Sequence, residues 1–175
     1  MRELATAGRV REFMRRLGPI PRTNTRIYLT GGATAVLLGW RESTIDIDIK
    51  MVPESDEVFR ALAELKESLH INVELASPDH FIPPVPGWED RSPFIAREGA
   101  IDWFHFDPYS QALSKIERGH EQDRADVREM LRRGLITPGL LREAFQKIKD
   151  GLIRYPALDP AAFARKLDEA LAASS

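Results

Sequence analysis

Residues 28–49 read YLTGGATAVLLGWRESTIDIDI, in which two adjacent glycines precede a short apolar run and two aspartates stand one residue apart. The alternation from Ile45 to Ile49 predicts a β-strand with one apolar face and one acidic face. Because a strand has a period of two, Asp46 and Asp48 are expected to point from the same face. Two carboxylates held this close repel each other unless a cation lies between them. Oxygen ligands alone favour Mg²⁺ or Mn²⁺.

The pair Gly31 and Gly32 fits the same chemistry. A backbone without Cβ atoms can approach a phosphate closely, and the following run ATAVLL predicts a short helix whose first N–H groups would face that anion. Thr34 adds a hydroxyl, and Arg41 and Thr44 are further candidate contacts to a nucleoside triphosphate. Each fragment also has a plain structural explanation, since paired glycines are common in turns and an Asp-x-Asp pattern is common on a solvated strand face.

The composition is that of a globular chain long enough to bury one substantial core, with 175 residues of which 43% are hydrophobic and 30% charged. With a formal net charge of −2, the chain as a whole is not expected to attract nucleic acid electrostatically. The absence of cysteine excludes disulfides and thiolate zinc sites. The charged start MRELATAGRVREFMRRLG lacks the apolar core of a signal peptide, and no run suits a membrane span. We therefore expect a cytoplasmic protein without a membrane partner.

Hydrophobic spacing predicts an α+β fold, with a mixed β-sheet core, flanking helices and an α-helical C-terminal part. Strands are expected at RIYLT, STIDIDIKMV, INVELA and GAIDWFHFD. Helices are expected before Gly18 and after Ser55, which is a good N-cap, and an irregular loop over the proline-rich residues 77–94. We expect an α/β core over residues 1–107 and a helical region over 108–175 that completes the cleft, both within a single compact unit.

The order of strand, Gly-Gly turn, short helix and Arg-Glu-Ser-Thr-Ile-Asp-Ile-Asp-Ile resembles the signature of the nucleotidyltransferase superfamily, which has the polymerase-beta-like fold. The nearest likeness is its abortive-infection toxin-type (AbiEii-like) branch with that branch's uncharacterised bacterial relatives. The resemblance covers residues 27 to about 131. A calcium loop, by contrast, would need oxygen ligands soon after Asp48, where the chain has Lys50, Met51 and Val52.

The superfamily signature also has a third carboxylate on a later strand, and two residues compete for that place. Glu74 in INVELA alternates with Ile71, Val73 and Leu75, which are expected to face the core. It follows the helix after the aspartate strand, where the resemblance expects the third acid. Asp102 in AIDWFHF also lies in an apolar, strand-like run. We prefer Glu74, although both residues could simply lie on an exposed strand face.

A second set of charges lies on the predicted helices after Asp107. Helical spacing puts Asp123 within the apolar stripe of its helix and Asp126 at the edge of that stripe, and a buried carboxylate needs a partner. The pattern Lys…Arg…Asp-x-x-Asp-Val resembles the C-terminal motif of the AbiEii-like branch, which implies that Lys115 binds a nucleotide phosphate and that the two aspartates complete the nucleotide site. We expect the Lys115 ammonium to reach a cleft from the margin of its stripe. The alternative is an internal network in which Lys115 or Arg118 pairs with the aspartates.

The resemblance implies an enzyme that moves a nucleoside monophosphate from a nucleoside triphosphate onto an acceptor. Asp46, Asp48 and Glu74 would bind Mg²⁺ or Mn²⁺, and Glu74 would also accept a proton from the acceptor hydroxyl. The implied phosphate contacts are Gly31, Gly32 and Lys115. The acceptor would be tRNA or protein, and a toxin-type role would bring an antitoxin-like protein partner. The alternative is an inactive module of the same fold that binds a nucleotide or a protein partner.

Overall fold

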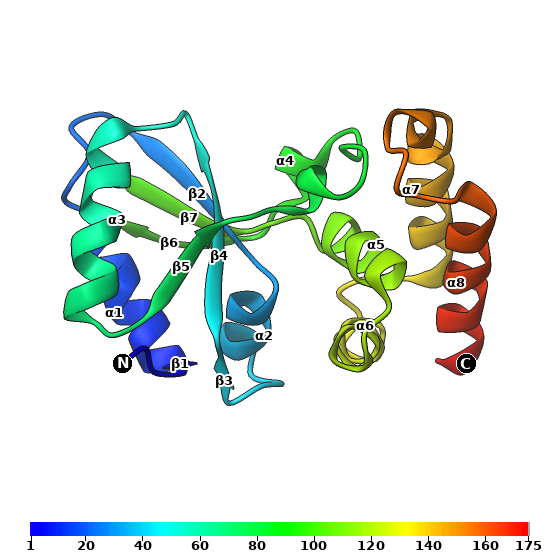
Figure 1. Cartoon of the computed structure of the whole chain (residues 1–175), viewed down its shortest axis with the longest axis horizontal. Coiled ribbons are helices and arrows are strands. Elements are labelled where there is room, and N and C mark those ends of the chain that lie inside the picture. The colour runs from blue at the N-terminus through cyan, green and yellow to red at the C-terminus, as the bar shows by residue number, and fades with distance from the viewer. Residues whose placement is uncertain (175) are drawn as a thin grey trace. The chain divides into compact units, whose positions relative to one another are not determined.

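The computed structural model describes residues 1–174, which fall into two units (Figure 1). The first unit combines Met1–Ser77 with Ser92–Phe106. The second combines Pro78–Arg91 with the chain from Asp107 onward. Sheet and helices together confirm the predicted α+β class, with the strands in the first unit and helices making up the second.

The first unit contains a mixed sheet of five strands in the order β5-β4-β2-β7-β6. These strands are β2 (Thr25–Thr30), β4 (Asp46–Val52), β5 (Asn72–Leu75), β6 (Phe94–Glu98) and β7 (Ile101–His105). The central strand β2 is antiparallel to β4 and parallel to β7, while β4 is parallel to β5. A separate ladder joins β1 (Ala5–Thr6) to β3 (Ser43–Thr44). The strands that carry Leu29, Asp46 and Glu74 are therefore neighbours in one mixed sheet, as the sequence predicts.

Three helices complete the first unit: α1 (Ala7–Leu17), α2 (Gly32–Leu38) and α3 (Asp56–Ser68). The hydroxyl of Thr6 accepts the Arg9 N–H and caps α1, and Ser55 accepts the Val58 N–H and caps α3. Helices α1 and α3 pack together over one face of the sheet (Figure 1). Their buried side chains join the inward-facing residues of the strands in a single hydrophobic core, which includes Trp103.

The core face of the sheet follows the predicted alternation along β4 but not beyond it. Ile47 and Ile49 are fully buried, whereas Ile45 is 70% exposed. Ile45 occupies the bend between β3 and β4, so the alternation of the strand does not reach it. Leu75 is also exposed, contrary to the expectation that it faces the core. Leu75 is the last residue of β5, and β5 is an edge strand with a neighbouring strand on one side only.

The second unit is built from helices, as the sequence predicts for the C-terminal part. Its elements are η1 (Pro78–His80), α4 (Trp88–Arg91), α5 (Pro108–Arg118), α6 (Glu121–Arg132), α7 (Pro138–Lys149), η2 (Asp150–Arg154) and α8 (Pro160–Ala173). Three of these helices begin with a proline that follows a capping Asp107, Thr137 or Asp159. Helix α5 packs against α6, α7 and α8. The proline-rich stretch expected to be irregular contains two short helical turns, η1 and α4.

Asp107 links two segments of the second unit that are distant in sequence. Its carboxylate is fully buried and receives the Arg91 Nε at 3.1 Å and Nη2 at 2.7 Å. It also accepts the N–H groups of Tyr109 and Ser110, so it caps α5 at the same time. A buried carboxylate is tolerated only when its oxygens are satisfied in this way.

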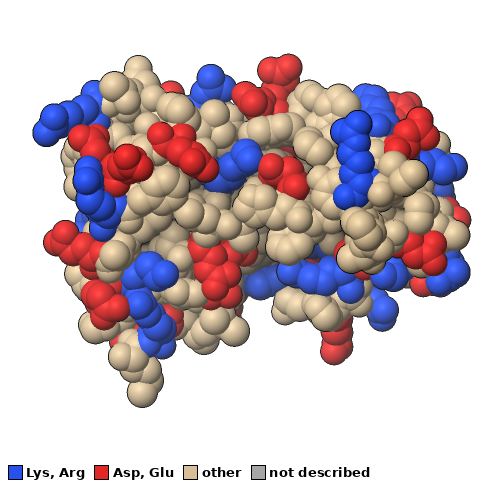
Figure 2. Space-filling model, turned by 45° about the horizontal axis from the view of Figure 1, so that its top comes forward, with Lys and Arg blue, Asp and Glu red and all other residues tan. Residues whose placement is uncertain are grey.

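Charges of both signs are interspersed over the face shown in Figure 2, in agreement with the small net charge of the chain. Within the described residues, no helix combines the length and the apolar character that crossing a membrane requires.

Candidate active site

Three carboxylates lie on one face of the neighbouring strands β4 and β5. In this parallel pair Asp46 is opposite Asn72, and Asp48 is opposite Glu74. Asp46 and Asp48 are partly exposed, while Ile47 between them is fully buried, so the two aspartates share the face away from the core. Directly opposed side chains on paired strands are close enough to interact. The strand pairing therefore brings Glu74 beside the aspartate pair.

The Asn72 amide connects two of the three carboxylates. Its Nδ2 donates to Asp46 Oδ1 at 2.6 Å and to Glu74 Oε1 at 3.1 Å. One amide nitrogen carries two hydrogens and can supply both bonds. This shared donor offsets the repulsion between the carboxylates of Asp46 and Glu74 and holds both on the same face of the sheet. Asn72 was not among the predicted site residues, although its place two residues before Glu74 in an alternating strand puts it on the same face.

The competing acid, Asp102, belongs to another part of the sheet. It lies on β7, which is separated from β4 by the central strand β2. Its register partner on β2 is Arg26, and its carboxylate pairs with Arg97 of β6 at 3.1 Å. Glu74, by contrast, is on the strand next to the aspartates. The geometry thus supports Glu74 over Asp102 as the third carboxylate.

The two glycines lie close to the acidic face and to the segment that precedes it. Gly31 has a φ of +63°, and a Cβ at this position would be 3.1 Å from Oδ2 of Asp48. A Cβ on Gly32 would be 2.0 Å from Oγ1 of Thr44 and 3.2 Å from Nη1 of Arg41. The turn after β2 therefore needs glycine for its backbone angle at the first position and for space at the second.

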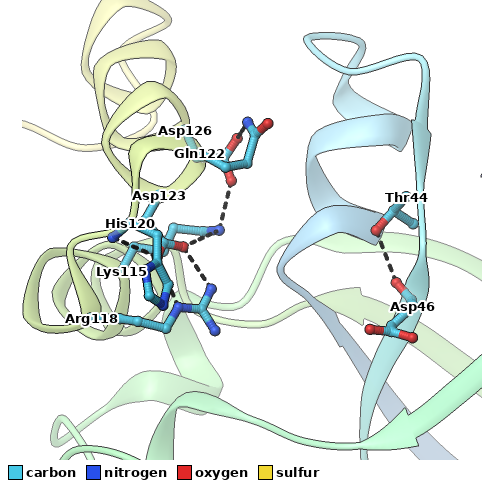
Figure 3. A network of polar contacts seen from close by, with 8 residues as sticks. All are labelled: Thr44, Asp46, Lys115, Arg118, His120, Gln122, Asp123 and Asp126. Carbon is cyan, nitrogen blue, oxygen red and sulfur yellow. Dashed lines mark hydrogen bonds and ion pairs between the residues drawn. The ribbon is translucent and has the colours of Figure 1, made fainter.

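The side chains of Arg41 and Thr44, both candidate nucleotide contacts, thus lie against the backbone of Gly32. The Thr44 hydroxyl donates to the Asp46 carbonyl oxygen at 3.1 Å (Figure 3). This bond fixes the bend at which the chain enters β4. The structure accordingly brings the predicted residues Gly31, Gly32, Arg41 and Thr44 to the N-terminal end of the aspartate strand.

Thr34, the remaining candidate in this unit, is buried and bonded within the protein. Its hydroxyl donates to the Leu29 carbonyl oxygen at 3.3 Å and lies 3.0 Å from Nδ1 of His105. Burial lowers the pKa of His105 to about 4, and the positive charge of Arg11 adds to the effect, so the imidazole is neutral at pH 7. These contacts fasten the first turn of α2 to the ends of β2 and β7, which is a role that the sequence did not predict for either residue.

The charged residues of the helical motif form a network within the second unit (Figure 3). The Lys115 ammonium is 2.7 Å from Asp126 Oδ2 and 3.9 Å from Asp123 Oδ1. Nε and Nη2 of Arg118 both donate to Asp123, at 2.8 Å and 2.6 Å, and the Gln122 amide donates to Asp126 at 3.3 Å. Burial by itself would raise the pKa of Asp123, but the hydrogen bond and charge of Arg118 and the charge of Lys115 outweigh it and lower that pKa.

This network is the internal arrangement that the sequence left open as an alternative to nucleotide binding. Lys115 was expected at the margin of its apolar stripe, yet only 7% of its side chain is exposed. The side chains of Asp123 and Asp126 are buried as well. The Lys115 ammonium is therefore directed at Asp126 of the adjacent helix α6, and a contact between Lys115 and a nucleotide stays a prediction.

The donor set on β4 and β5 fits a divalent cation that is partly coordinated by its substrate. Within residues 1–174, no three acidic, histidine or cysteine side chains form a ready cage for a metal ion. Asp46, Asp48 and Glu74 nonetheless offer only oxygen donors on one face, as Mg²⁺ and Mn²⁺ prefer. Magnesium is commonly held by one or two carboxylates together with substrate phosphates. The chemistry of the three donors, without a preformed cage, is that of this type of site.

Comparison with protein families gives a match to a family described as "Nucleotidyltransferase of unknown function (DUF6036)", over residues 8–154. The matched range includes all five strands of the main sheet and the helices from α1, except its first residue, to α7. Comparisons with curated proteins and with solved structures give no match.

Proposed function

Because the chain belongs to this family of nucleotidyltransferases, we propose that it transfers a nucleoside monophosphate from a nucleoside triphosphate to an acceptor hydroxyl, with Mg²⁺ or Mn²⁺ as cofactor. The observation that carries the proposal is the register of β4 and β5, which puts Asp48 opposite Glu74 and Asp46 two residues away on the same face. The close approach of Gly31 to Asp48 supports it, because a triphosphate needs backbone without side chains beside the acids.

Each residue has a defined task in this reaction. Asp46 and Asp48 would hold the cation, whose positive charge stabilises the negative charge of the triphosphate. Gly31 would leave room for the phosphates, whereas the space beside Gly32 is occupied by Thr44 Oγ1. Glu74 is exposed and so can accept the proton of the acceptor hydroxyl. The new bond joins the acceptor oxygen to the α-phosphorus, and the bond from that phosphorus to pyrophosphate breaks.

Asn72 would act as a positioning residue for this set. Its two hydrogen bonds orient Asp46 and Glu74 before any ligand binds, so less ordering is needed when the triphosphate arrives. The acceptor class and a toxin-type role come from the AbiEii-like resemblance alone. We propose RNA or protein as the acceptor, with an antitoxin-like partner, and the balanced charge of the chain favours neither acceptor.

A second candidate is an inactive module of the same fold that binds a nucleotide or a protein. One observation favours it: Lys115, which the resemblance assigns to a nucleotide phosphate, is buried in an ion pair with Asp126. Transfer of label from an α-labelled triphosphate to RNA or protein separates the two candidates. An inactive module would bind the nucleotide and release no pyrophosphate.

The test of the proposed site is calorimetric titration of Mn²⁺ with and without a non-hydrolysable triphosphate. We expect the wild type to bind the metal at least about tenfold more tightly with nucleotide present, because the phosphates supply missing ligands. The double variant Asp46→Asn/Asp48→Asn should lose this gain. Asp102→Asn is the matched control, since it removes a carboxylate from the same sheet and should keep the gain. Equal nucleotide-dependent binding in all three proteins would show that the aspartate pair is not the metal site.

A further inference from the structure

A groove in the second unit is not used by the proposed reaction. It has a volume of about 540 Å³ and lies among α6, α8 and the C-terminal end of α5. Its apolar lining includes Ile116 and Val127, which are only 5% and 2% exposed, and the more accessible Ala170 and Ala173 of α8. Cavities of this size are in the range that small organic ligands occupy.

The charged lining of the groove is mostly positive. Arg118, Arg124, Arg128 and Lys166 line it, and Glu169 is the one acidic residue among its described lining residues. The chain as a whole carries slightly more acidic than basic residues, so this composition is local to the groove. Four cations around one concave site favour an anionic ligand.

Two of the four cations already have partners in the fold. Arg118 is held by Asp123 through two hydrogen bonds. The Lys166 ammonium donates to the carbonyl oxygen of Glu117 at 2.7 Å, near the end of α5. A cation is favoured there because the last carbonyl groups of a helix lack partners within the helix. These two side chains therefore define the wall of the groove.

The other two cations are turned to solvent. Arg124 and Arg128 are four residues apart on α6 and both are exposed. Among the described residues, neither side chain makes a hydrogen bond or an ion pair. Residues at this spacing are neighbours on one helix face, with Cβ atoms about 6 Å apart, so both guanidinium groups can reach one ligand. The planar guanidinium matches the geometry of a phosphate through paired N–H donors.

We propose that this groove binds a small phosphate-bearing organic ligand, with Arg124 and Arg128 on the phosphate and the apolar residues Ala170 and Ala173 against its carbon skeleton. None of its described lining residues is aromatic. Single-stranded nucleic acid is held largely by stacking of bases on aromatic side chains, so the lining favours a small ligand over an RNA strand. The proposal goes beyond the transfer reaction and does not depend on it.

The test is titration of the full chain with ribose 5-phosphate and with inorganic phosphate in the presence of EDTA. Without a divalent cation the carboxylate site does not contribute, so this result is independent of the proposed transferase activity. Ribose 5-phosphate should bind more tightly than inorganic phosphate because its sugar contacts the apolar lining. The variant Arg124→Gln/Arg128→Gln should weaken ribose 5-phosphate binding by at least about tenfold. Glu169→Gln should tighten it, since one negative charge leaves the groove.

The matched control is Arg154→Gln/Arg165→Gln, which removes two exposed arginines that do not line the groove. Its affinity should stay within about threefold of the wild type, as expected for distant surface charges. Equal weakening in both double variants would overturn the proposal, because it would reflect net charge alone. The proposal is also overturned if the wild type shows no saturable binding of ribose 5-phosphate at millimolar concentrations. Tighter, Arg124-dependent binding of a ten-nucleotide RNA would assign the groove to nucleic acid instead.

Discussion

Replacing Lys115 by alanine tests whether the network between α5 and α6 stabilises the second unit. The change removes the ammonium 2.7 Å from Asp126, whose side chain is fully buried. Breaking a buried pair by removing one partner typically costs about 3–5 kcal/mol, because the other charge is left in a poor environment. The Gln122 amide still donates to Asp126. We therefore expect the lower end of this range, about 3 kcal/mol.

The measurement is urea denaturation followed by far-ultraviolet circular dichroism, which reports on the helices. Lys147→Ala is the control, since this lysine is exposed on α7 and its loss should change the free energy of unfolding by less than about 0.5 kcal/mol. The variant Lys115→Met/Asp126→Leu removes both charges and keeps apolar volume. It should recover most of the lost stability, because an apolar pair can replace a buried ion pair.

The stability and the triphosphate affinity of Lys115→Ala together distinguish a structural role of Lys115 from a role in phosphate binding. If Lys115→Ala lowers the free energy of unfolding by less than about 1 kcal/mol, the pair with Asp126 is not a structural necessity. If it also weakens triphosphate binding strongly, Lys115 has the phosphate role that the AbiEii-like resemblance implies. A stability loss near 3 kcal/mol with unchanged triphosphate affinity would assign the helical motif to the architecture of the second unit.

Two further predictions concern the first unit. Gly32→Ala should lower the free energy of unfolding, measured by urea denaturation, by about 1–3 kcal/mol, because its Cβ would be 2.0 Å from Thr44 Oγ1. The control Gly139→Ala in α7 has open space and should be neutral or stabilising. Equal losses of stability in the two variants would contradict this prediction. Because the folded pKa of His105 is about 4 and lies below the ordinary histidine value of 6.5, the unfolded state binds more protons between these two pH values. The free energy of unfolding should therefore fall by about 3 kcal/mol as the pH drops from 7 to 4. His105→Asn should lack this contribution to the pH dependence. If the free energy of unfolding of the wild type and the variant changes with pH in parallel, His105 is not its source.

Much of the fold follows from local patterns in the sequence. The alternation in β4 and the capping residues of α3 and α5 are local signals, and the structure contains these elements where the patterns predict them. Strand β6 (Phe94–Glu98) was not predicted: Phe94 falls at the end of the expected loop, and residues 95–98 were assigned to no element. None of its residues is fully buried, so it has no alternating apolar face that a sequence pattern could reveal.

The site depends more on contacts between distant segments. That Asp48 is opposite Glu74 follows from the parallel pairing of β4 and β5 across α3, and a one-residue shift would turn Glu74 to the other face. The choice between Lys115 and Arg118 as partner of each aspartate depends on the angle at which α6 leaves the turn at Gly119. Sequence spacing indicates which charges share a helix face, but it does not give the angle between two helices.

The division of the chain into two units has a consequence for protein dissection and for synthesis on the ribosome. The chain crosses from one unit to the other three times, after Ser77, after Arg91 and after Phe106. A fragment that begins at Asp107 would lose Arg91, and a fully buried carboxylate would be left without its guanidinium partner. A fragment that ends at Ser77 would lack β7, the parallel neighbour of the central strand. Neither unit is therefore a contiguous piece of the chain, and the sheet is completed only after residues of the second unit have already been synthesised.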